Sequence, residues 1–392
     1  MGFEKHIDKR ILKIAKDIVE KWNVCDNCLG RQFAQIGRGF TNQERGRVIR
    51  KVLLSKKQAK PFDPKKGCEV CLGFFKNIDK WVEKALKALR GLEFQSFLVG
   101  TLMSDEFAKR EESLWEDVGI EYCESIKAEI NREVGKLIEK KTGKKVDKEN
   151  PDVVITLDLQ NQKIDIRITS VYFYGEYKKL IRGIPQTKWD KYPLTIEDII
   201  AKPFMEALEG KAHAMHAAGR EDIDARCLDW RPFVLEIIEP KKRDTDLSKI
   251  QKIINETGMI EVRNLRKTDR HDVVRVKSMS PDKTYRILVE FEKPLKDLER
   301  LKSLIGPIKQ KTPTRVLHRR ADRLRIKRVK DIKWKVINNK NLELIIKGQS
   351  GLYIKELVTG DDGRTRPSVS EILDNPGKVI ELDVIKIHLE EA

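Results

Sequence analysis

Two closely spaced cysteine pairs constrain the beginning of this chain more than any other feature of the sequence. Cys25 and Cys28 form the first pair, and Cys68 and Cys71 follow after an interval of 39 residues. Each pair can bind one edge of a tetrahedral ion, so two pairs complete a closed thiolate site that suits structural zinc. Four buried thiols paired by chance are the simpler alternative, and the long interval leaves a redox role open. We expect a zinc ion that supports folding and offers no open position for catalysis.

The period of the hydrophobic pattern changes within the first half of the chain. Helical spacing of apolar residues predicts helices over residues 11–22, 80–90 and 105–141. The stretch between residues 24 and 73 is expected to be rich in loops. Strict alternation at 155–159 and again at 164–168 predicts a β-hairpin. The first half is therefore expected to be an α+β module.

The second half of the chain mixes the two periods. Strand patterns fall around residues 233–238, 284–291, 342–347 and 379–388, and helical patterns at 247–256, 295–304 and 368–374. Because no strict strand-helix-strand rhythm is present, they predict an α+β domain on a mixed, largely antiparallel sheet. A shift to aromatic and basic residues near 172–190 places the domain boundary close to residue 175. We therefore expect two regions, 1–175 and 176–392.

Net charge points to the class of partner. The formal charge of the chain is +18, and such an excess attracts polyanions, with nucleic acid the favoured choice. A charge-rich surface of the heat-adapted kind is the alternative, but it does not explain a surplus of Lys and Arg over acidic residues. No apolar run is long enough to cross a bilayer, and the first residues form no signal peptide. We expect a monomeric cytoplasmic protein with no membrane partner.

The segment from Gly219 to Arg226 is the most informative for chemistry. It contains three carboxylates and two guanidinium groups, and its glycine permits a tight turn before Arg220. An aspartate beside arginine or lysine stays ionised and keeps one orientation, which suits a nucleophile or a general base. A solvated loop of ion pairs is the plainer interpretation. The chain has no phosphate-binding glycine loop and no dinucleotide fingerprint, which makes a nucleotide-driven enzyme less expected.

The same segment carries a family resemblance. Gly219 to Asp222 resembles the Gly-Arg-x-Asp motif of pseudouridine synthases, and the longer string GREDIDARCLDWRPFVLEI is similar to one family in particular. That family is the archaeal and eukaryotic tRNA pseudouridine synthases that act on positions 54 and 55 of the T-arm. The strings KTYRI at 283–287 and GLYIKEL at 351–357 resemble its later motifs in the expected order. One departure is visible, since Asp229 and Trp230 stand where the family usually has glycines.

The resemblance implies roles for individual residues. Asp222 is the expected catalytic carboxylate, which either adds to the base of a flipped-out uridine or assists loss of that base from the sugar. Tyr285 is expected to stack on the base and Lys355 to face Asp222, although Tyr285 also fits an ordinary apolar stripe. Tyr353 and Arg220 are expected to be further substrate contacts. Zinc is the only cofactor implied, with no organic cofactor, and the first half resembles an RNA-binding module of the THUMP type.

Residues 311–330 form the most basic segment, with nine Lys or Arg residues and one Asp. This density predicts a loop that orders on tRNA, with a solvated basic helix as the alternative. Arginine forks onto phosphate oxygens, and five arginines are expected to do so: Arg315, Arg319, Arg320, Arg323 and Arg325. A second RNA-facing loop is expected to use Arg182 and Lys188.

Three other functions fit parts of the sequence. A non-catalytic zinc-dependent tRNA-binding protein explains the charge and the cysteines but leaves three ordered motifs unexplained. An RNA methyltransferase predicts a glycine-rich cofactor loop after a strand, which the sequence lacks. A transcription factor predicts a preference for duplex DNA over folded tRNA. The pseudouridine synthase accounts for the most features.

Overall fold

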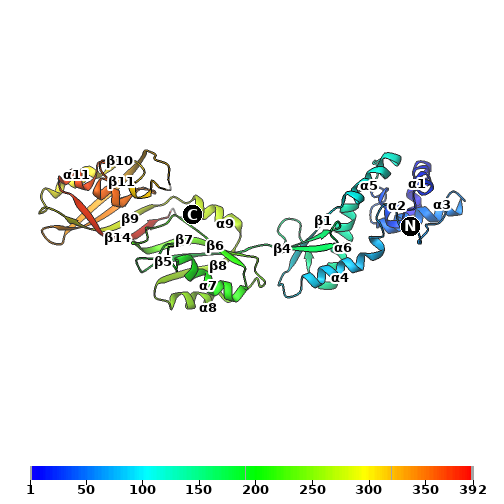
Figure 1. Ribbon diagram of the computed structural model, residues 1–392, viewed down its shortest axis with the longest axis horizontal. Coiled ribbons are helices and arrows are strands. Elements are labelled where there is room, and N and C mark those ends of the chain that lie inside the picture. The colour runs from blue at the N-terminus through cyan, green and yellow to red at the C-terminus, as the bar shows by residue number, and fades with distance from the viewer. Residues whose placement is uncertain (1, 190, 319, 390–392) are drawn as a thin grey trace. The chain divides into compact units, whose positions relative to one another are not determined.

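The computed structural model describes residues 2–189, 191–318 and 320–389. The chain forms two compact units, Met1–Thr169 and Ser170–Ala392, which we describe separately (Figure 1). The boundary expected at residue 175 falls inside β5 (Val171–Lys179), a strand of the second unit. The structural division therefore lies a few residues earlier than the composition shift indicates.

The first unit packs helices against a small sheet. Its described helices are η1 (Phe3–His6), α1 (Lys9–Lys21), α2 (Asp26–Arg31), α3 (Asn42–Ser55), η2 (Phe75–Asn77), α4 (Ile78–Ala88), α5 (Asp105–Val118) and α6 (Ile126–Thr142). Its strands are β1 (Ser96–Leu102), β2 (Lys145–Val146), β3 (Val153–Asp158) and β4 (Lys163–Ile168), in the order β2-β1-β3-β4. The expected hairpin is confirmed, because β3 pairs antiparallel with β4 and places Leu157 opposite Ile164.

Two expectations for this unit are wrong. The helix expected over 105–141 is two helices, because Gly119 ends α5 with a left-handed φ of 81°. The stretch expected to be loop-rich contains α3, which a capping box of Thr41 and Glu44 begins. The buried face of α3 includes Arg45 and Arg50, so an apolar pattern could not reveal it.

The second unit is built on one large sheet. The strands within its described residues are β5, β6 (Ala212–Ala217), β7 (Arg226–Ile238), β8 (Ile260–Thr268), β9 (Asp282–Phe291), β10 (Gly306–Gln310), β11 (Arg325–Val336), β12 (Asn341–Gly348), β13 (Thr365–Arg366) and β14 (Gly377–His388). Their order is β13-β10-β11-β12-β9-β14-β7-β5-β8, with β6 paired to β7. Of the pairings between these strands, only that of β14 with β7 is parallel. The expected α+β fold on a mainly antiparallel sheet is confirmed.

Helices cover this sheet and close two main cores. They are α7 (Ile196–Leu208), α8 (Leu247–Asn255), α9 (Arg270–Ser278), η3 (Leu298–Leu304), η4 (Thr314–Val316), α10 (Ile354–Thr359) and α11 (Val369–Leu373). Figure 1 shows α7 and α8 on one side of β5, β7 and β8, and α9 on the other. A separate core joins β9, β12 and β14 to α10 and α11. The turn that carries Asp222 joins β6 to β7, so paired strands of this sheet hold both of its ends.

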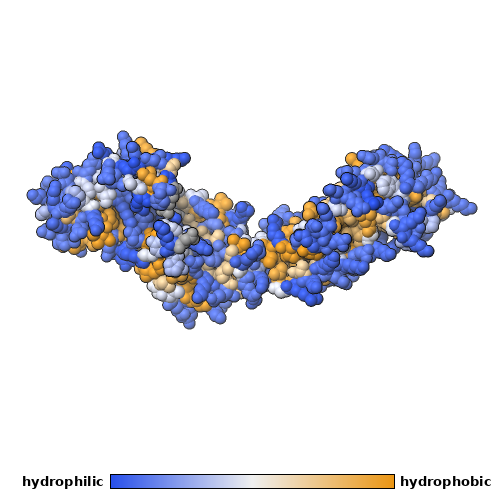
Figure 2. All heavy atoms as spheres, in the orientation of Figure 1, coloured by the Kyte–Doolittle hydropathy of each residue, from blue (hydrophilic) through white to orange (hydrophobic). Residues whose placement is uncertain are grey.

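The outer faces of both units carry many charged residues. Figure 2 shows mostly hydrophilic residues on the drawn face of each unit, with apolar residues in separate patches. Within the described ranges, no helix combines the length and the apolar character that a membrane crossing requires.

Candidate active site and metal site

The turn between β6 and β7 carries the three carboxylates of the motif. Gly219 begins the turn with a φ of +76°, and a Cβ at this position would lie 3.4 Å from Nη1 of Arg231. The N–H of Ala225 donates to the carbonyl oxygen of Asp222 at 3.0 Å and closes the turn. A side chain at Gly219 would therefore meet both backbone strain and a crowded neighbour.

Asp222 contacts two cations. Nη2 of Arg315 lies 3.1 Å from Oδ2 of Asp222, and Nη1 donates to Oδ1 at 3.3 Å. Nζ of Lys355 lies 3.5 Å from Oδ2. One guanidinium group thus reaches both carboxylate oxygens, through one hydrogen bond and one ion-pair contact, and such charge-assisted contacts restrain the orientation of the carboxylate. The side chain of Asp222 is still 34% exposed, so the oriented carboxylate remains reachable from solvent.

Lys355 lies closer to Asp224 than to Asp222. Its Nζ donates to both carboxylate oxygens of Asp224 at 2.7 Å. Partial burial alone would raise the pKa of Asp224, but the hydrogen bond and charge of Lys355 outweigh it and lower that pKa. The partner expected for Asp222 is thus shared with a second carboxylate. Glu356 completes the network by accepting from Nε of Arg315 at 2.7 Å.

Glu221 is directed into the unit instead. It is buried, and its Oε2 lies 3.2 Å from Nη2 of Arg231 and accepts from the hydroxyl of Tyr177 at 3.2 Å. Nε2 of Gln186 donates to the same hydroxyl at 2.7 Å. A buried ion pair is costly unless such hydrogen bonds accompany it. No local pattern indicates this cluster, because its members come from β5, the loop that follows it, the turn and β7.

A cavity of about 480 Å³ adjoins the turn. Its size lies in the range of small-molecule pockets. Several residues expected in the site line it: Asp222, Arg220, Lys188, Arg315 and Lys355. The remaining lining residues include Trp189 and His318, so the wall combines cations with aromatic rings.

The two expected tyrosines lie outside the described lining of this cavity. Tyr285 is 9% exposed and belongs to the core around β9. Burial, partly offset by the charge of Arg231, raises the pKa of Tyr285 to about 12, and the carboxylate of Asp222 acts in the same direction. The hydroxyl of Tyr353 accepts from Nη1 of Arg320 at 2.8 Å. Tyr285 is thus within electrostatic reach of Asp222, whereas Tyr353 contacts the basic segment.

In the basic segment 311–330, the described residues up to 324 form a loop with a short 3-10 turn, η4, and residues 325–330 belong to β11. Arg323 is exposed, and Nη1 of Arg325 donates to Oγ1 of Thr312 at 3.0 Å. Arg319 lies outside the described residues. The expected loop is therefore present only up to residue 324, and Arg315 contacts Asp222 rather than pointing freely to solvent.

Arg182 and Lys188 occupy different environments. Nη1 of Arg182 donates to the carbonyl oxygens of Asp224 at 2.9 Å and Leu382 at 2.7 Å. Its Nη2 also lies 2.7 Å from the buried carboxylate of Asp383. Lys188 is exposed and lines the cavity. Of the two residues expected to face RNA, Arg182 is thus engaged inside the unit.

The four cysteines of the first unit converge as their spacing predicts. Their Sγ atoms all lie within 4.8 Å of one another, and those of Cys25 and Cys71 are 3.8 Å apart. Four thiolates at the usual zinc–sulfur distance form a tetrahedron with edges of about 3.8 Å. The N–H of Cys25 donates to Sγ of Cys68, and Nη1 of Arg31 donates to Sγ of Cys28. These residues fit one metal ion that has four sulfur ligands.

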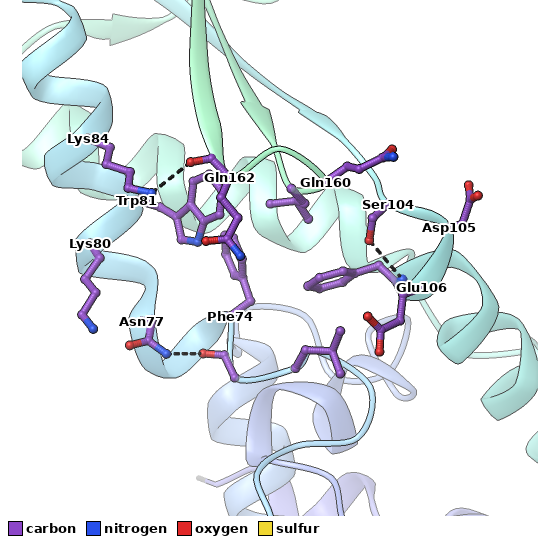
Figure 3. A pocket seen from close by; sticks show the side chains of 14 residues that line it. Phe74, Asn77, Lys80, Trp81, Lys84, Ser104, Asp105, Glu106, Gln160 and Gln162 are labelled. Carbon is purple, nitrogen blue, oxygen red and sulfur yellow. Dashed lines mark hydrogen bonds between the residues drawn. The ribbon is translucent and has the colours of Figure 1, made fainter.

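A second hollow, of about 670 Å³, lies in the first unit (Figure 3). It is lined by α4, the start of α5 and the turn between β3 and β4. The ring of Trp81 already stacks on Phe74 at 5.8 Å, and Nζ of Lys84 lies 5.0 Å from its centroid. Lys84 also donates to the carbonyl oxygen of Gln162 at 3.0 Å. Because this aromatic ring is already packed within the chain, we assign no ligand to the hollow.

Comparison with known proteins gives matches along most of the chain. Residues 172–388 match the family model described as Pus10, C-terminal, and residues 81–158 match the one described as Pus10 THUMP domain, archaeal. The tRNA pseudouridine synthase Pus10 of Pyrococcus furiosus is 41% identical over 387 residues, which cover 96% of this chain and 98% of that protein. The protein of the same name from Methanothrix thermoacetophila is 38% identical over 427 residues, which cover 96% and 94%. Among solved structures, a Cbf5-Nop10-Gar1 complex matches 54% of this chain and 48% of the other, with 15% identity and a TM-score of 0.32.

Proposed function

The chain belongs to the Pus10 family of tRNA pseudouridine synthases, and on that basis we propose that Asp222 is the carboxylate that acts on a flipped-out uridine in the T-arm of tRNA. The observation that supports this role is the contact of Arg315 with both carboxylate oxygens of Asp222, which restrains the carboxylate beside a cavity and leaves it partly exposed. The other two carboxylates of the turn fit less well. Glu221 is buried against Arg231, and both oxygens of Asp224 are bound by Lys355.

The geometry suits the chemistry of the isomerisation. The reaction breaks the bond between N1 of uracil and C1′ of the ribose and rejoins the base through C5. The proton lost from C5 is balanced by the proton gained at N1, so no oxidant or energy source is consumed. An oriented carboxylate can add to the base or assist its loss from the sugar. Arg315 and Lys355 hold Asp222 in place for either route.

The extruded base needs contacts that replace those of the RNA stack. Stacking on an aromatic ring is worth about 1–3 kcal/mol per base, and Tyr285 is the ring that we propose for this contact. Its small exposed area requires that the base approach the edge of the core around β9. We assign Arg220, Tyr353 and Lys188 to the RNA around the target uridine, because they are exposed or half-exposed near the same turn and loop.

The first unit has a separate role in this proposal. A tetrahedral site of four thiolates is typical of structural zinc, and we assign a structural zinc ion to the four cysteines. The first unit, with its THUMP domain, then binds tRNA, while the second unit carries the chemistry. We propose that three arginines of the basic segment 311–330 contact phosphates: Arg320, Arg323 and Arg325.

The target uridines are uridine 55 and, in this proposal, uridine 54 as well. Transcripts in which cytidine replaces one uridine at a time separate the two positions. Loss of product only in the transcript that lacks uridine 55 would restrict the enzyme to that position.

The deciding experiment measures tritium release from tRNA labelled at C5 of uracil. Wild type is compared with Asp222→Asn and with Asp224→Asn, a matched control two residues away in the same turn. We expect release by wild type, reduced release by Asp224→Asn, and none above background by Asp222→Asn with tRNA binding intact. Equal release by wild type and Asp222→Asn would remove Asp222 from the mechanism.

A further inference from the structure

Lys179 is a fully buried lysine at the end of β5. Its Nζ donates to two consecutive backbone carbonyl oxygens, that of Ile223 at 2.8 Å and that of Asp222 at 3.3 Å. A cation taken out of water is costly unless polar groups surround it. Burial lowers the pKa of Lys179, and the carboxylates of Glu221 and Asp224 oppose that effect. The turn therefore supplies most of the partners that this buried ammonium group needs.

The same short segment of the chain binds three carbonyl groups of the turn. Besides Lys179, the N–H of Gly183 donates to the carbonyl oxygen of Ile223 at 2.8 Å, and Arg182 donates to that of Asp224 at 2.9 Å. Three consecutive carbonyl groups, those of residues 222–224, are thus bound by residues 179–183. The side chains of Asp222 and Asp224 are bound instead by Arg315 and Lys355.

We propose that Lys179 is a positioning residue for Asp222, an inference that rests on the catalytic role proposed for that aspartate. By holding the carbonyl groups of Asp222 and Ile223, Lys179 sets the direction in which the Asp222 side chain leaves the turn. It does so without meeting the substrate, because it is fully buried and is not part of the described lining of the cavity. A misplacement of about 1 Å at a reacting group can cost about a hundredfold in rate.

The neighbouring lysine provides a matched control. Lys178 precedes Lys179 in β5, but its Nζ lies over the ring of Trp230, 4.3 Å from the centroid, and not under the turn. Lys179→Met and Lys178→Met each remove one positive charge from the same strand. They differ in whether the carbonyl groups of residues 222 and 223 lose the ammonium group as a donor, while the N–H groups of Ala225 and Gly183 stay in place.

The test combines single-turnover kinetics, tRNA affinity and amide hydrogen exchange on the full chain. For Lys179→Met we expect a single-turnover rate about tenfold to a hundredfold below wild type, with the Kd for tRNA within about twofold. Peptides covering residues 219–225 are expected to exchange faster in this variant. Lys178→Met is expected to keep the wild-type rate and exchange in this turn. Lys179→Arg, which keeps the cation, is expected to recover part of the lost rate.

Wild-type turnover by folded Lys179→Met would overturn the inference. An increased Kd with an unchanged single-turnover rate would also overturn it, because that pattern marks a substrate contact. If Lys179→Met does not fold, Lys179→Gln takes its place, since its shorter side chain cannot hold both carbonyl groups at their present distances. Asp222→Asn in the same series separates the two proposals. An active Asp222→Asn enzyme removes the proposed function, whereas an inactive one beside a fully active Lys179 variant removes only this inference.

Discussion

The guanidinium group of Arg315 binds two carboxylates at once, with Nη2 3.1 Å from Oδ2 of Asp222 and Nε donating to Glu356 at 2.7 Å. Charge density alone assigned this arginine to phosphate. The structure places its guanidinium group instead against the proposed catalytic carboxylate. Because Glu356 is buried and holds Nε, Arg315 cannot swing toward RNA without losing a hydrogen bond.

Arg315→Met is expected to lower kcat by about tenfold to a hundredfold while changing KM less than threefold, because the lost contact orients a reacting group. Arg323→Met removes an exposed arginine from the same loop and is the control. We expect the control to raise KM and leave kcat nearly unchanged. Steady-state kinetics on tRNA give both parameters. The opposite pattern, with Arg315→Met acting on KM alone, would return Arg315 to phosphate binding.

Substitutions of Arg182 and Lys188 are expected to differ in the same way, with one acting on kcat and the other on tRNA binding. Arg182 donates to the carbonyl oxygens of Asp224 and Leu382, so Arg182→Met should lower kcat and the melting temperature with little change in tRNA affinity. Lys188→Met should weaken tRNA binding, with a smaller dependence of affinity on salt concentration. Filter binding at several salt concentrations, together with kcat, distinguishes the two. If Arg182→Met alters the salt dependence instead, its side chain reaches RNA.

Cys28→Ala is expected to abolish metal binding by the first unit. Metal binding of this kind contributes about 10–16 kcal/mol in small zinc-dependent domains, so the first unit should unfold at a lower temperature while the transition of the second unit stays in place. Elemental analysis and calorimetry measure the two effects. Cys123→Ala, at a half-buried cysteine outside the cluster, is the control and should keep the metal. One zinc ion per chain in Cys28→Ala would rule out the proposed ligand set.

The difference in stability between wild type and Lys283→Met is expected to depend on pH. Burial, followed by the charge of Arg231, lowers the pKa of Lys283 to about 8. In the unfolded chain this pKa is about 10.4, so the folded state bears the cost of the buried cation at neutral pH. That cost amounts to about 3 kcal/mol and disappears as the pH rises from about 8 to about 10.4. Lys283→Met should therefore be more stable than wild type at pH 7, with the advantage lost above about pH 10.

Denaturant unfolding at pH 7 and pH 10 measures this difference directly. Lys386→Met removes a lysine whose side chain is 61% exposed and is the control, expected to change stability little at either pH. A Lys283→Met variant that is destabilised equally at both pH values would show that the hydrogen bond from Lys283 to Pro281 outweighs the cost of burial.

The periodicity of apolar residues predicted the elements that bury one apolar face. The alternation at 155–159 and 164–168 gave the β3–β4 hairpin, because strands with one buried face repeat every two residues. Helix α3 was not predicted because its buried positions include Arg45 and Arg50. Their guanidinium groups donate hydrogen bonds to backbone oxygens and to Asp26. Those partners lie elsewhere in the chain and leave no trace in the periodicity.

The candidate site likewise contains residues that the sequence motifs predicted and residues that they did not. Motif order alone brought Asp222 and Lys355 together, and they do lie in one network. Lys179 was given no role and Arg182 was expected to face RNA, because a lysine or arginine near a basic, aromatic stretch has the same local pattern whether it faces RNA or supports a turn. Only the pairing of β5 with β7 decides between these roles by placing Lys179 under the carbonyl groups.

The position of β14 has a consequence for the order in which this protein matures during synthesis. The strand Gly377–His388 follows the other strands of this sheet in the chain, yet it lies in the middle of the sheet, with β9 on one side and β7 on the other. Without this strand, β9 and β7 would each have an unpaired edge where they now pair with β14. Asp383 of this strand also binds Arg226, at the start of β7, and Arg182, beside the turn. A chain released before residue 377 would therefore lack both the central strand of its sheet and a support of its proposed active site, so it should be aggregation-prone and inactive.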